Sequence, residues 1–297
     1  MSQTKIKNKT QHIPVLLQEV LQTLNPSEGE SYVDMTAGYG GHASAIIEKT
    51  NGKAYLIDRD ENAQAVLRGI FSSKQNVELY HLSFLEACQQ FVSEGRHFDM
   101  ILADLGVSSP HLDNTDRGFS LLAEAKLDMR MDPRQEKSAY DVVNSYSEEQ
   151  LTKILREYGE EPKARQMARS IVMARPITTT LELAAVAKKV WPGHSRSHPA
   201  TRLFQAVRIE VNNELGQIEE ALPLAVKLLK PSGRLAIITF HSLEDRIVKR
   251  FFKQMAGDRY DAELVEVTNG PIVASEDELV YNPRARSAKL RVVRKRK

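Results

Sequence analysis

The sequence has one cysteine, Cys88, among its 297 residues. A single thiol excludes an intramolecular disulfide and is typical of a small core residue in a reducing compartment. No run approaches the about 18 apolar residues of a membrane-crossing helix. The polar stretch 1–10 lacks the apolar segment of a secretory signal. We therefore expect a cytoplasmic protein without a membrane partner.

The chain also lacks a strong net charge, since its formal charge is only +2. Apolar content of 41% and charged content of 27% are ordinary for a globular protein. The length allows one large α/β domain, or one with a smaller companion. The positive charges are uneven, because eight of the last 14 residues are lysine or arginine and none is acidic. This block is either a solvated chain end or a contact surface for phosphates.

Glycine is concentrated in the stretch 31–42, around which the chain is organised. The apolar run 32–35 predicts a buried strand, and a helix is expected from residue 43 to 49. Between them, Gly38, Gly40 and Ala43 have the G-x-G-x-x-A spacing of a dinucleotide site. After the next apolar run comes Asp58, a carboxylate placed to accept the ribose hydroxyls of an adenosine. These features predict a nucleoside-type cofactor, either NAD(P) or S-adenosylmethionine.

Asp34 favours the second cofactor. It stands at the junction of the first strand and the glycine turn. A carboxylate there would repel a pyrophosphate but attract the ammonium group of a methionine moiety. The sequence therefore favours methyl transfer.

Alternating apolar runs and helical patterns predict an α/β fold with a right-handed, doubly wound parallel sheet. The ends of the first, second and fourth strands carry Asp34, Asp58 and Asp104, which should meet at the carboxyl edge of the sheet. Strands are expected at 29–35, 53–57, 77–82, 98–103, 234–240, 263–268 and 288–294. Helices are expected at 18–24, 62–71, 84–94, 214–229 and 243–255.

Between residues 112 and 212 the strand pattern stops. Four helices are expected there, at 147–158, 162–174, 179–190 and 200–211, after a charged loop-like segment. This stretch predicts an inserted all-helical domain for substrate recognition. The domains expected are thus the first part of a methyltransferase domain, the insert, and the second part with its basic end, at 1–111, 112–212 and 213–297.

Ten distinctive motifs are spread along the chain: HIPVLL at 12–17, YGGH at 39–42, DRD at 58–60, DLGVSSP at 104–110, RGFS at 117–120, LDMRMD at 127–132, YGEE at 158–161, PATRLFQA at 199–206, FHSLEDR at 240–246 and RSAKLR at 286–291. Together they resemble the motifs of the bacterial RsmH (MraW) family. The resemblance implies a Rossmann-like methyltransferase sheet with a helical insert. It also implies an S-adenosylmethionine-dependent enzyme that methylates N4 of a cytidine in 16S ribosomal RNA, with the small ribosomal subunit as partner.

The resemblance also implies a cofactor site. Carried over residue by residue, it consists of Gly40, Gly41, His42, Asp58, Phe84, Asp104 and His111. His111 departs from the glutamine that the family usually has, although both side chains can donate a hydrogen bond. The segment 34–38 departs in the residues around its threonine, which should alter packing only.

Asp104 is the candidate catalytic residue. The cytosine N4 is a poor nucleophile because its lone pair is conjugated with the ring, and an acceptor for an N4–H bond would localise that pair. Asp104 or a backbone carbonyl in 105–110 could serve, and Asp104 could instead only bind the cofactor. His241 has two open interpretations, as a contact to base or phosphate or as a structural residue. No metal is expected, because His194 and His198 have no cysteine or carboxylate partner nearby.

Two other functions remain open at this point. An NAD(P)-dependent reductase could use the same sheet, but no tyrosine–lysine or histidine pair for a nicotinamide is evident. A non-catalytic RNA-binding assembly factor could keep the fold, although the intact Gly38, Gly40, Asp58 and Asp104 speak against it. The sequence also leaves a homodimer open.

Overall fold

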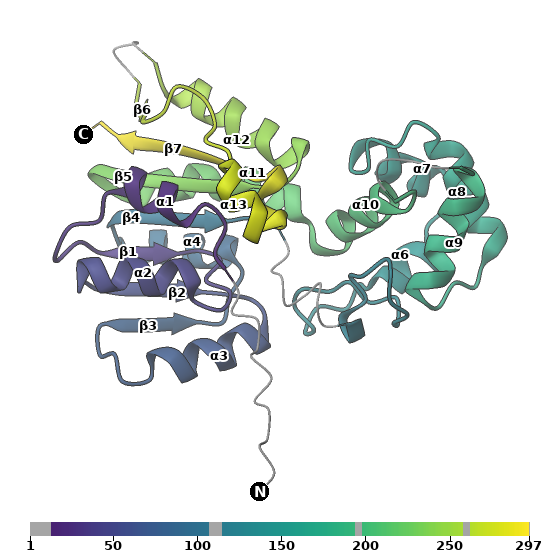
Figure 1. The fold of residues 1–297 in the computed structure, drawn as a ribbon, viewed down its shortest axis with the longest axis horizontal. Helices are drawn as coiled ribbons and strands as arrows, with labels where there is room; N and C mark the ends of the chain where they lie inside the picture. The colour runs from purple at the N-terminus through teal and green to yellow at the C-terminus, as the bar shows by residue number, and fades with distance from the viewer. Residues whose placement is uncertain (1–12, 107–114, 194–197, 258–261, 297) are drawn as a thin grey trace, which may run out of the picture. The chain divides into compact units, whose positions relative to one another are not determined.

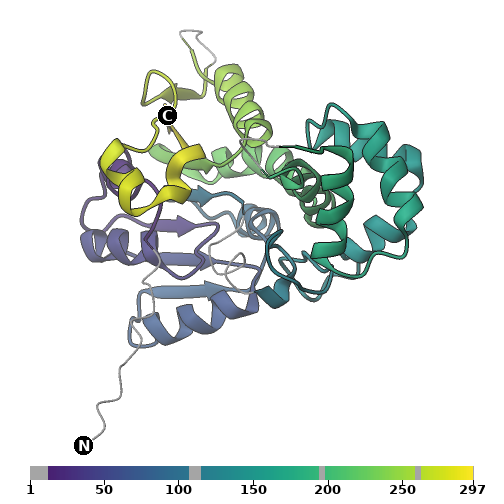
Figure 2. The ribbon, with the colours of Figure 1, turned by 45° about the vertical axis from the view of Figure 1, so that its right-hand side comes forward.

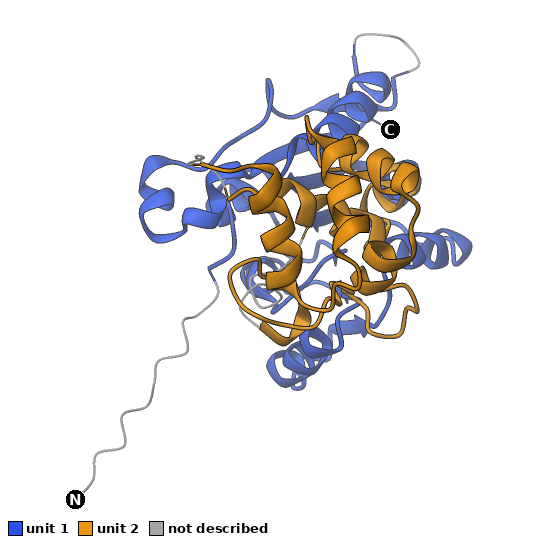
Figure 3. Cartoon of the chain, turned by 90° about the vertical axis from the view of Figure 1, so that its right-hand side faces the viewer, with its two compact units in different colours: residues 1–105, 221–297 blue, residues 106–220 orange. Residues whose placement is uncertain are grey.

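The computed structural model describes residues 13–106, 115–193, 198–257 and 262–296. The chain forms two compact units, the first made of 1–105 with 221–297 and the second of 106–220. Figure 3 colours the two units separately. Within the described residues, no helix is both long enough and apolar enough to cross a membrane.

A seven-stranded sheet forms the centre of the first unit, in the order β3-β2-β1-β4-β5-β7-β6 (Figure 1). The strands are β1 (Tyr32–Asp34), β2 (Ala54–Ile57), β3 (Val77–Tyr80), β4 (Phe98–Asp104), β5 (Leu229–Thr239), β6 (Leu264–Glu266) and β7 (Lys289–Lys295). Strands β1 to β5 pair in parallel, whereas β7 is antiparallel to both β5 and β6. All seven predicted strands are present.

Helices cover both faces of this sheet, which confirms the doubly wound architecture. The helices are α1 (Leu17–Leu24), α2 (Gly41–Thr50), α3 (Glu61–Phe71), α4 (Phe84–Ser93), α12 (Ser242–Met255) and α13 (Glu276–Tyr281), with a 3-10 turn η2 (Pro283–Ser287). On one face, α1, α2 and α3 pack on alternate strand residues such as Leu56, Leu102 and Ile238. On the other, Phe91 of α4 makes edge-to-face contacts with Tyr55 and Phe98.

The direction of β7 differs from the parallel arrangement expected. The chain leaves β6 at the carboxyl edge of the sheet, and β7 re-enters beside Thr239, the last residue of β5. A strand that returns from the edge at which its predecessor ended must run in the opposite direction. Half of the eight cations in the basic block near the end of the sequence lie in this strand, namely Lys289, Arg291, Arg294 and Lys295.

The start of β5 also differs from expectation. Residues 230–233 were predicted to end a helix, but β5 already begins at Leu229. Its pairing with β4 shifts register between Phe98 and Met100, so the segment forms an irregularity in the strand. Ser232 adopts a φ of +66° there. The proline, serine and glycine at 231–233 therefore form a bulge inside the strand and do not end a helix.

The second unit contains helices without a strand in its described part. They are a 3-10 turn η1 (Thr115–Arg117), α6 (Ala139–Ser145), α7 (Glu148–Glu157), α8 (Ala164–Ala174), α9 (Thr180–Val190) and α10 (Thr201–Asn212), and α11 (Glu214–Lys227) begins here. Capping boxes at Ser138, Ser147 and Thr179 fix three of the starts. The helices share one apolar core, in which Met129 and Met131 are buried. Helix α6 was missed, although its serine–aspartate capping pair was a readable signal.

A second missed helix, α13, lies beside the start of α1 (Figures 1 and 2). Glu278 of α13 is buried, and its Oε1 accepts a hydrogen bond of 2.9 Å from the Leu16 N–H. Leu16 has a φ of +56° and precedes α1 as its N-cap. Two segments far apart in the sequence are therefore tied together, the start of α1 and α13.

Two glycines allow a matched test of the packing. A Cβ at Gly52 would lie 2.1 Å from the Glu30 carbonyl oxygen, whereas a Cβ at Gly69, inside α3, would have no neighbour within 4 Å. Gly52→Ala should destabilise the fold by roughly 1–3 kcal/mol through overpacking. Gly69→Ala should stabilise it by roughly 0.5–1 kcal/mol through helix propensity. Urea unfolding of both variants measures this, and equal midpoints would contradict the packing at Gly52.

Candidate cofactor and active site

The glycine turn after β1 is tied to both neighbouring strands. The Met35 N–H donates 2.8 Å to the Leu102 carbonyl of β4, and the Ala37 N–H donates 2.8 Å to the Ile57 carbonyl of β2. These bonds continue the sheet pairing beyond the end of β1. The turn is thereby held over the carboxyl edge of the sheet, where doubly wound folds bind their ligands.

The glycines in this turn are needed for its shape. Gly38 and Gly40 have φ values of +52° and +77°, which favour glycine. Gly40 is the N-cap of α2 and has no side chain to satisfy the first N–H groups of that helix. A Cβ at Gly41 would lie 2.4 Å from Pro14 Cγ. The helix start therefore presents backbone N–H donors to a ligand.

Asp34 ends β1 and is 1% exposed. Its Oδ2 accepts 2.8 Å from the Tyr32 hydroxyl and its Oδ1 accepts 3.2 Å from the Thr36 N–H. Burial raises the pKa of Asp34 to about 7, and the charge of Asp58 contributes in the same direction. Asp34 is too enclosed to touch a ligand, so it acts on the site through its charge.

Asp104 ends β4, and Thr36 connects it to Asp34. The Asp104 N–H donates 2.6 Å to Thr36 Oγ1. Asp104 Oδ1 is inaccessible and has no hydrogen-bond partner among the described residues. Burial, followed by the charges of Asp34 and Glu244, holds the pKa of Asp104 well above its ordinary value.

His42, in the first turn of α2, lies next to this carboxyl group. Its Nε2 is 2.9 Å from the Val15 carbonyl, and its Nδ1 is 3.9 Å from Asp104 Oδ2. Because a carbonyl can only accept, Nε2 carries the hydrogen, and a neutral His42 has its lone pair on Nδ1. The imidazole thus presents a basic nitrogen toward Asp104.

Asp58 follows β2 and is used by the backbone. Its Oδ2 accepts 2.8 Å from the Gly38 N–H, and its Oδ1 accepts 2.8 Å from the Asp60 N–H. A carboxylate has about four acceptor positions, so one such group can bind backbone N–H groups and a ribose hydroxyl together. They also join the end of β2 to the glycine turn.

The structure brings most of the predicted site residues to one edge of the first unit. Gly40, Gly41 and His42 follow β1, Asp58 follows β2, the half-buried Phe84 begins α4 after β3, and Asp104 ends β4. His111 lies outside the described residues, as do the backbone carbonyls 107–110 that were considered as acceptors. Thr36 and Tyr32 were not predicted, since a threonine and a tyrosine near a strand give no signal for such a bridge.

His241 is the N-cap of α12. Its side chain accepts from the Glu244 N–H at 3.4 Å, while Glu244 Oε2 accepts from the Phe240 and His241 N–H groups at 2.8 and 3.2 Å. This is a capping box with histidine in the serine position. Of the two interpretations left open for His241, the structure supports the structural one. His198 likewise accepts a backbone N–H, from Ala200, and His194 lies outside the described residues.

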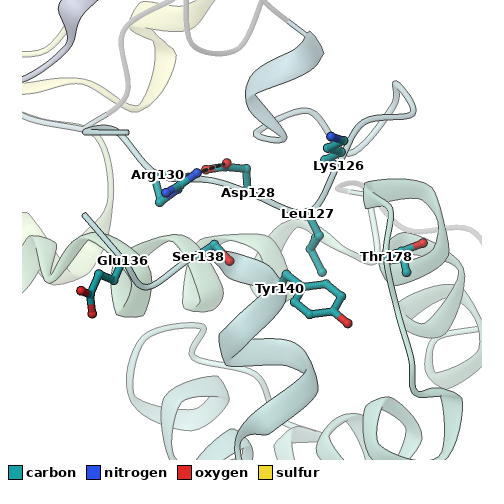
Figure 4. A pocket seen from close by; sticks show the side chains of 8 residues that line it. All are labelled: Lys126, Leu127, Asp128, Arg130, Glu136, Ser138, Tyr140 and Thr178. Carbon is teal, nitrogen blue, oxygen red and sulfur yellow. Dashed lines mark hydrogen bonds and ion pairs between the residues drawn. The ribbon is translucent and has the colours of Figure 1, made fainter. Parts of the chain in front are cut away.

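A separate pocket of about 450 Å³ opens in the second unit (Figure 4). It is lined by Lys126, Leu127, Asp128, Arg130, Glu136, Ser138, Tyr140 and Thr178. Arg130 is held by Asp128 at 2.8 Å, so this guanidinium is already paired. No predicted site residue lines this pocket, which is therefore distinct from the cluster at the sheet edge.

The charge of the sheet-edge cluster indicates its ligand. In the described part of the chain, no lysine or arginine forms an ion pair with Asp34, which is buried, or with Asp104, which is half-buried. Such groups are costly when ionised unless a positive charge comes near. A ligand with an ammonium and a sulfonium group fits this edge, whereas a pyrophosphate does not.

The doubly wound sheet, the glycine turn that opens α2 and the acidic edge together define an α/β enzyme of the nucleoside-cofactor-dependent methyltransferase class. Residues 9–296 match the model of the MraW methylase family. The chain belongs to that family and is a methyltransferase, which removes the reductase and the non-catalytic alternatives.

Named relatives are similar over nearly the whole chain. The ribosomal RNA small subunit methyltransferase H of Clostridioides difficile (strain 630) is 45% identical over 306 residues, covering 96% of this chain and 98% of the relative. The protein of that name from Nostoc sp. is 47% identical over 289 residues, covering 96% and 92%. Among solved structures, an rRNA methylase from Streptococcus thermophilus has a TM-score of 0.44 at 11% identity, covering 94% and 95%.

The raised pKa of Asp34 predicts a pH-dependent stability. The pKa of Asp34 in the folded protein is about 7, above the ordinary 3.8, so folding is favoured when this carboxyl group is protonated. Its contribution to the free energy of unfolding is greatest below about pH 4 and is lost as the pH rises through 7. That contribution is at most about 4 kcal/mol. Asp34→Asn stays neutral, so its Tm should exceed that of the wild type by several degrees near pH 8 and approach it near pH 5.

Calorimetry completes this test. The same Asp34→Asn substitution should weaken binding of S-adenosylmethionine by roughly 10- to 100-fold near pH 8, because a partly screened charge interaction is lost. A variant with wild-type affinity and a wild-type pH profile of Tm would show that Asp34 is neither strained nor electrostatically coupled to the ligand.

Proposed function

We propose that this protein transfers a methyl group from S-adenosylmethionine to N4 of a cytidine in 16S ribosomal RNA within the small ribosomal subunit. Family membership and the printed names of the relatives support the cofactor and the RNA class. A ribosomal substrate also gives the cytoplasm as the proposed compartment. The single observation that carries the choice of an amine acceptor is Asp104, a half-buried carboxyl group that ends β4 beside the glycine turn and keeps 22% of its side chain exposed.

The cofactor would be held by residues that follow four neighbouring strands. We assign the ribose to Asp58, the polar end of the methionine moiety to the N–H groups at Gly40, Gly41 and His42, and an apolar contact to Phe84. His111 keeps its assignment from the family resemblance alone. When bound, S-adenosylmethionine supplies a methyl group attached to a sulfonium. The rest of the cofactor then leaves as a neutral thioether.

Asp104 would act on the cytosine amine. Its carboxylate accepts one N4–H bond, which localises the nitrogen lone pair toward the methyl group and stabilises the positive charge that develops on N4. After the N–C bond forms, the amine must lose one proton, and Asp104 can accept it. The raised pKa of Asp104 makes it a better base than an ordinary aspartate.

His42 would receive or share that proton. Its Nδ1 lies 3.9 Å from Asp104 Oδ2, which is beyond a direct hydrogen bond and within reach after a small side-chain movement or through water. The Val15 carbonyl fixes the tautomer that presents this nitrogen. His42 thereby links proton removal to the N-terminal segment that packs on α2.

The helical unit is proposed to recognise RNA. Its described surface exposes unpaired cations on three helices, among them Arg156 on α7, Arg169 on α8 and Lys188 on α9. Phosphate contacts of this kind provide affinity that is largely independent of sequence. A homodimer remains an open proposal, for which the oligomeric state in solution is the measurement.

Methyl incorporation tests the function directly. The purified protein, labelled S-adenosylmethionine and small subunits from cells that lack this enzyme should give label in 16S ribosomal RNA, and digestion should release N4-methylated cytidine. Subunits from cells that contain the enzyme are the control, and they should accept little label. Label in another nucleoside, or in free RNA but not in subunits, would contradict the corresponding part of the proposal.

Asp104→Asn separates catalysis from cofactor binding. Asparagine keeps the shape but cannot accept a proton, so the single-turnover rate at saturating cofactor should fall about 100- to 1000-fold. Affinity for S-adenosylmethionine, measured separately by calorimetry, should change much less. A chemical step within about threefold of the wild type would leave Asp104 as a cofactor ligand and would assign the N4 contact to a backbone carbonyl.

A further inference from the structure

Helix α12 carries a stripe of four cations that the proposed chemistry does not use. Arg246, Lys249, Arg250 and Lys253 recur at i, i+3, i+4 and i+7, which places them on one face of the helix. All four are exposed, while Leu243, Val248 and Phe252 are buried on the opposite face. We call these four residues the α12 stripe.

Three of the four cations in the stripe have no acidic partner in the described part of the chain. From residue 246 to the end of α12 at Met255 the sequence contains no aspartate or glutamate. Lys249, Arg250 and Lys253 form no hydrogen bond or ion pair in the described part of the chain. An exposed helix face that only contacts water more often carries both acidic and basic residues. A uniform stripe instead attracts an extended anion.

The position of α12 connects the stripe to the active edge. The helix begins directly after β5, at the N-cap His241, on the carboxyl edge of the sheet. It then packs on β5, β7 and β6, as Figure 1 also shows. From Arg246 to Lys253 the stripe covers about 10 Å of helix axis. It thus leads from the edge that holds Asp104 along the first unit.

Lys289, at the start of β7, adds a further cation near the carboxyl edge of the sheet. Lys289 pairs with Thr239 in the β5–β7 register, while Asp104 pairs with Ile238 in the β4–β5 register. Lys289 is therefore two strand spacings, roughly 10 Å, from Asp104. Asp245 accepts from both Lys289, at 3.0 Å, and Arg291, at 2.7 Å, so this group keeps one net positive charge. The side chain of Lys289 is 40% exposed.

We propose that the α12 stripe binds the phosphate backbone of the RNA strand that carries the target cytidine, next to the methylation site. The inference rests on the proposed function and adds to it a substrate-binding surface in the sheet unit. A row of lysines and arginines along one helix face contacts successive phosphates and does not read bases. The stripe therefore provides affinity and direction, and sequence selection lies elsewhere.

The salt dependence of RNA binding tests this surface. The triple variant Lys249→Gln, Arg250→Gln and Lys253→Gln removes three cations without touching the cofactor site. The matched control, Lys49→Gln, Lys53→Gln and Lys74→Gln, removes three exposed cations from other elements of the same unit. Both variants have the same net charge, so a difference between them reports on position. The probe is a 16S ribosomal RNA transcript, measured by filter binding over a series of salt concentrations.

The stripe variant should lower the slope of log K against log salt by about 2, since each phosphate contact on a single strand contributes about 0.7. The control should lower it by less than one contact. The stripe variant should have a lower kcat/KM for RNA in the methylation assay. Its single-turnover rate at saturating RNA should stay near that of the wild type. Calorimetry with S-adenosylmethionine and the Tm should be unchanged in both variants.

Two outcomes would overturn the inference. Equal slopes of log K against log salt for the stripe and control variants would show that this face of α12 does not contact the RNA. A wild-type slope combined with a slower chemical step would assign α12 a structural effect on the active edge. Because binding is measured on the transcript without turnover, the stripe is judged even if the methyl-incorporation experiment fails.

Discussion

Thr36 bridges two acidic residues at the edge of the sheet: its N–H donates to the Asp34 carboxyl group, and its hydroxyl oxygen accepts from the backbone N–H of Asp104. Each of these acids ends a strand, and both strands are fixed by the pairing of Asp34 with Leu102. Neither acid can move away from the other without breaking the sheet. Burial raises the pKa of both groups, the charge of Asp58 adds to the rise at Asp34, and the charge of Asp34 adds to the rise at Asp104. A cationic ligand at this edge would relieve that cost.

The segment that precedes α1 supports the same edge from outside. Pro14 packs where a side chain on Gly41 would stand, and the Val15 carbonyl fixes the His42 ring. The buried Glu278 in turn fixes the Leu16 N–H. This contact joins residues that are separated by 262 positions in the sequence. A change in α13 could alter proton removal without contacting the ligand, through the position of Val15.

Periodicity was enough to predict the parallel core of the sheet, because buried parallel strands read as short apolar runs that end in polar residues such as Asp58 and Asp104. It could not give the direction of β7, which depends on where the chain re-enters the sheet. It also could not reveal the Thr36 bridge, since that bridge exists only once β1 and β4 are paired. The capping role of His241 was hidden for a related reason, because histidine is rarely the side chain that caps a helix.

The first unit therefore separates its charges. Acids without a cation in the described chain, Asp34 and Asp104, lie inside the carboxyl edge, whereas exposed cations lie outside it on α12 and at Lys289. The inner group would attract a small cationic cofactor and repel a phosphate, and the outer cations would do the reverse, as both proposals require. In the proposed reaction the target base carries no phosphate on its N4 edge, so this edge can approach Asp104 without an electrostatic penalty. The charge pattern would then decide which part of the RNA reaches the methyl group.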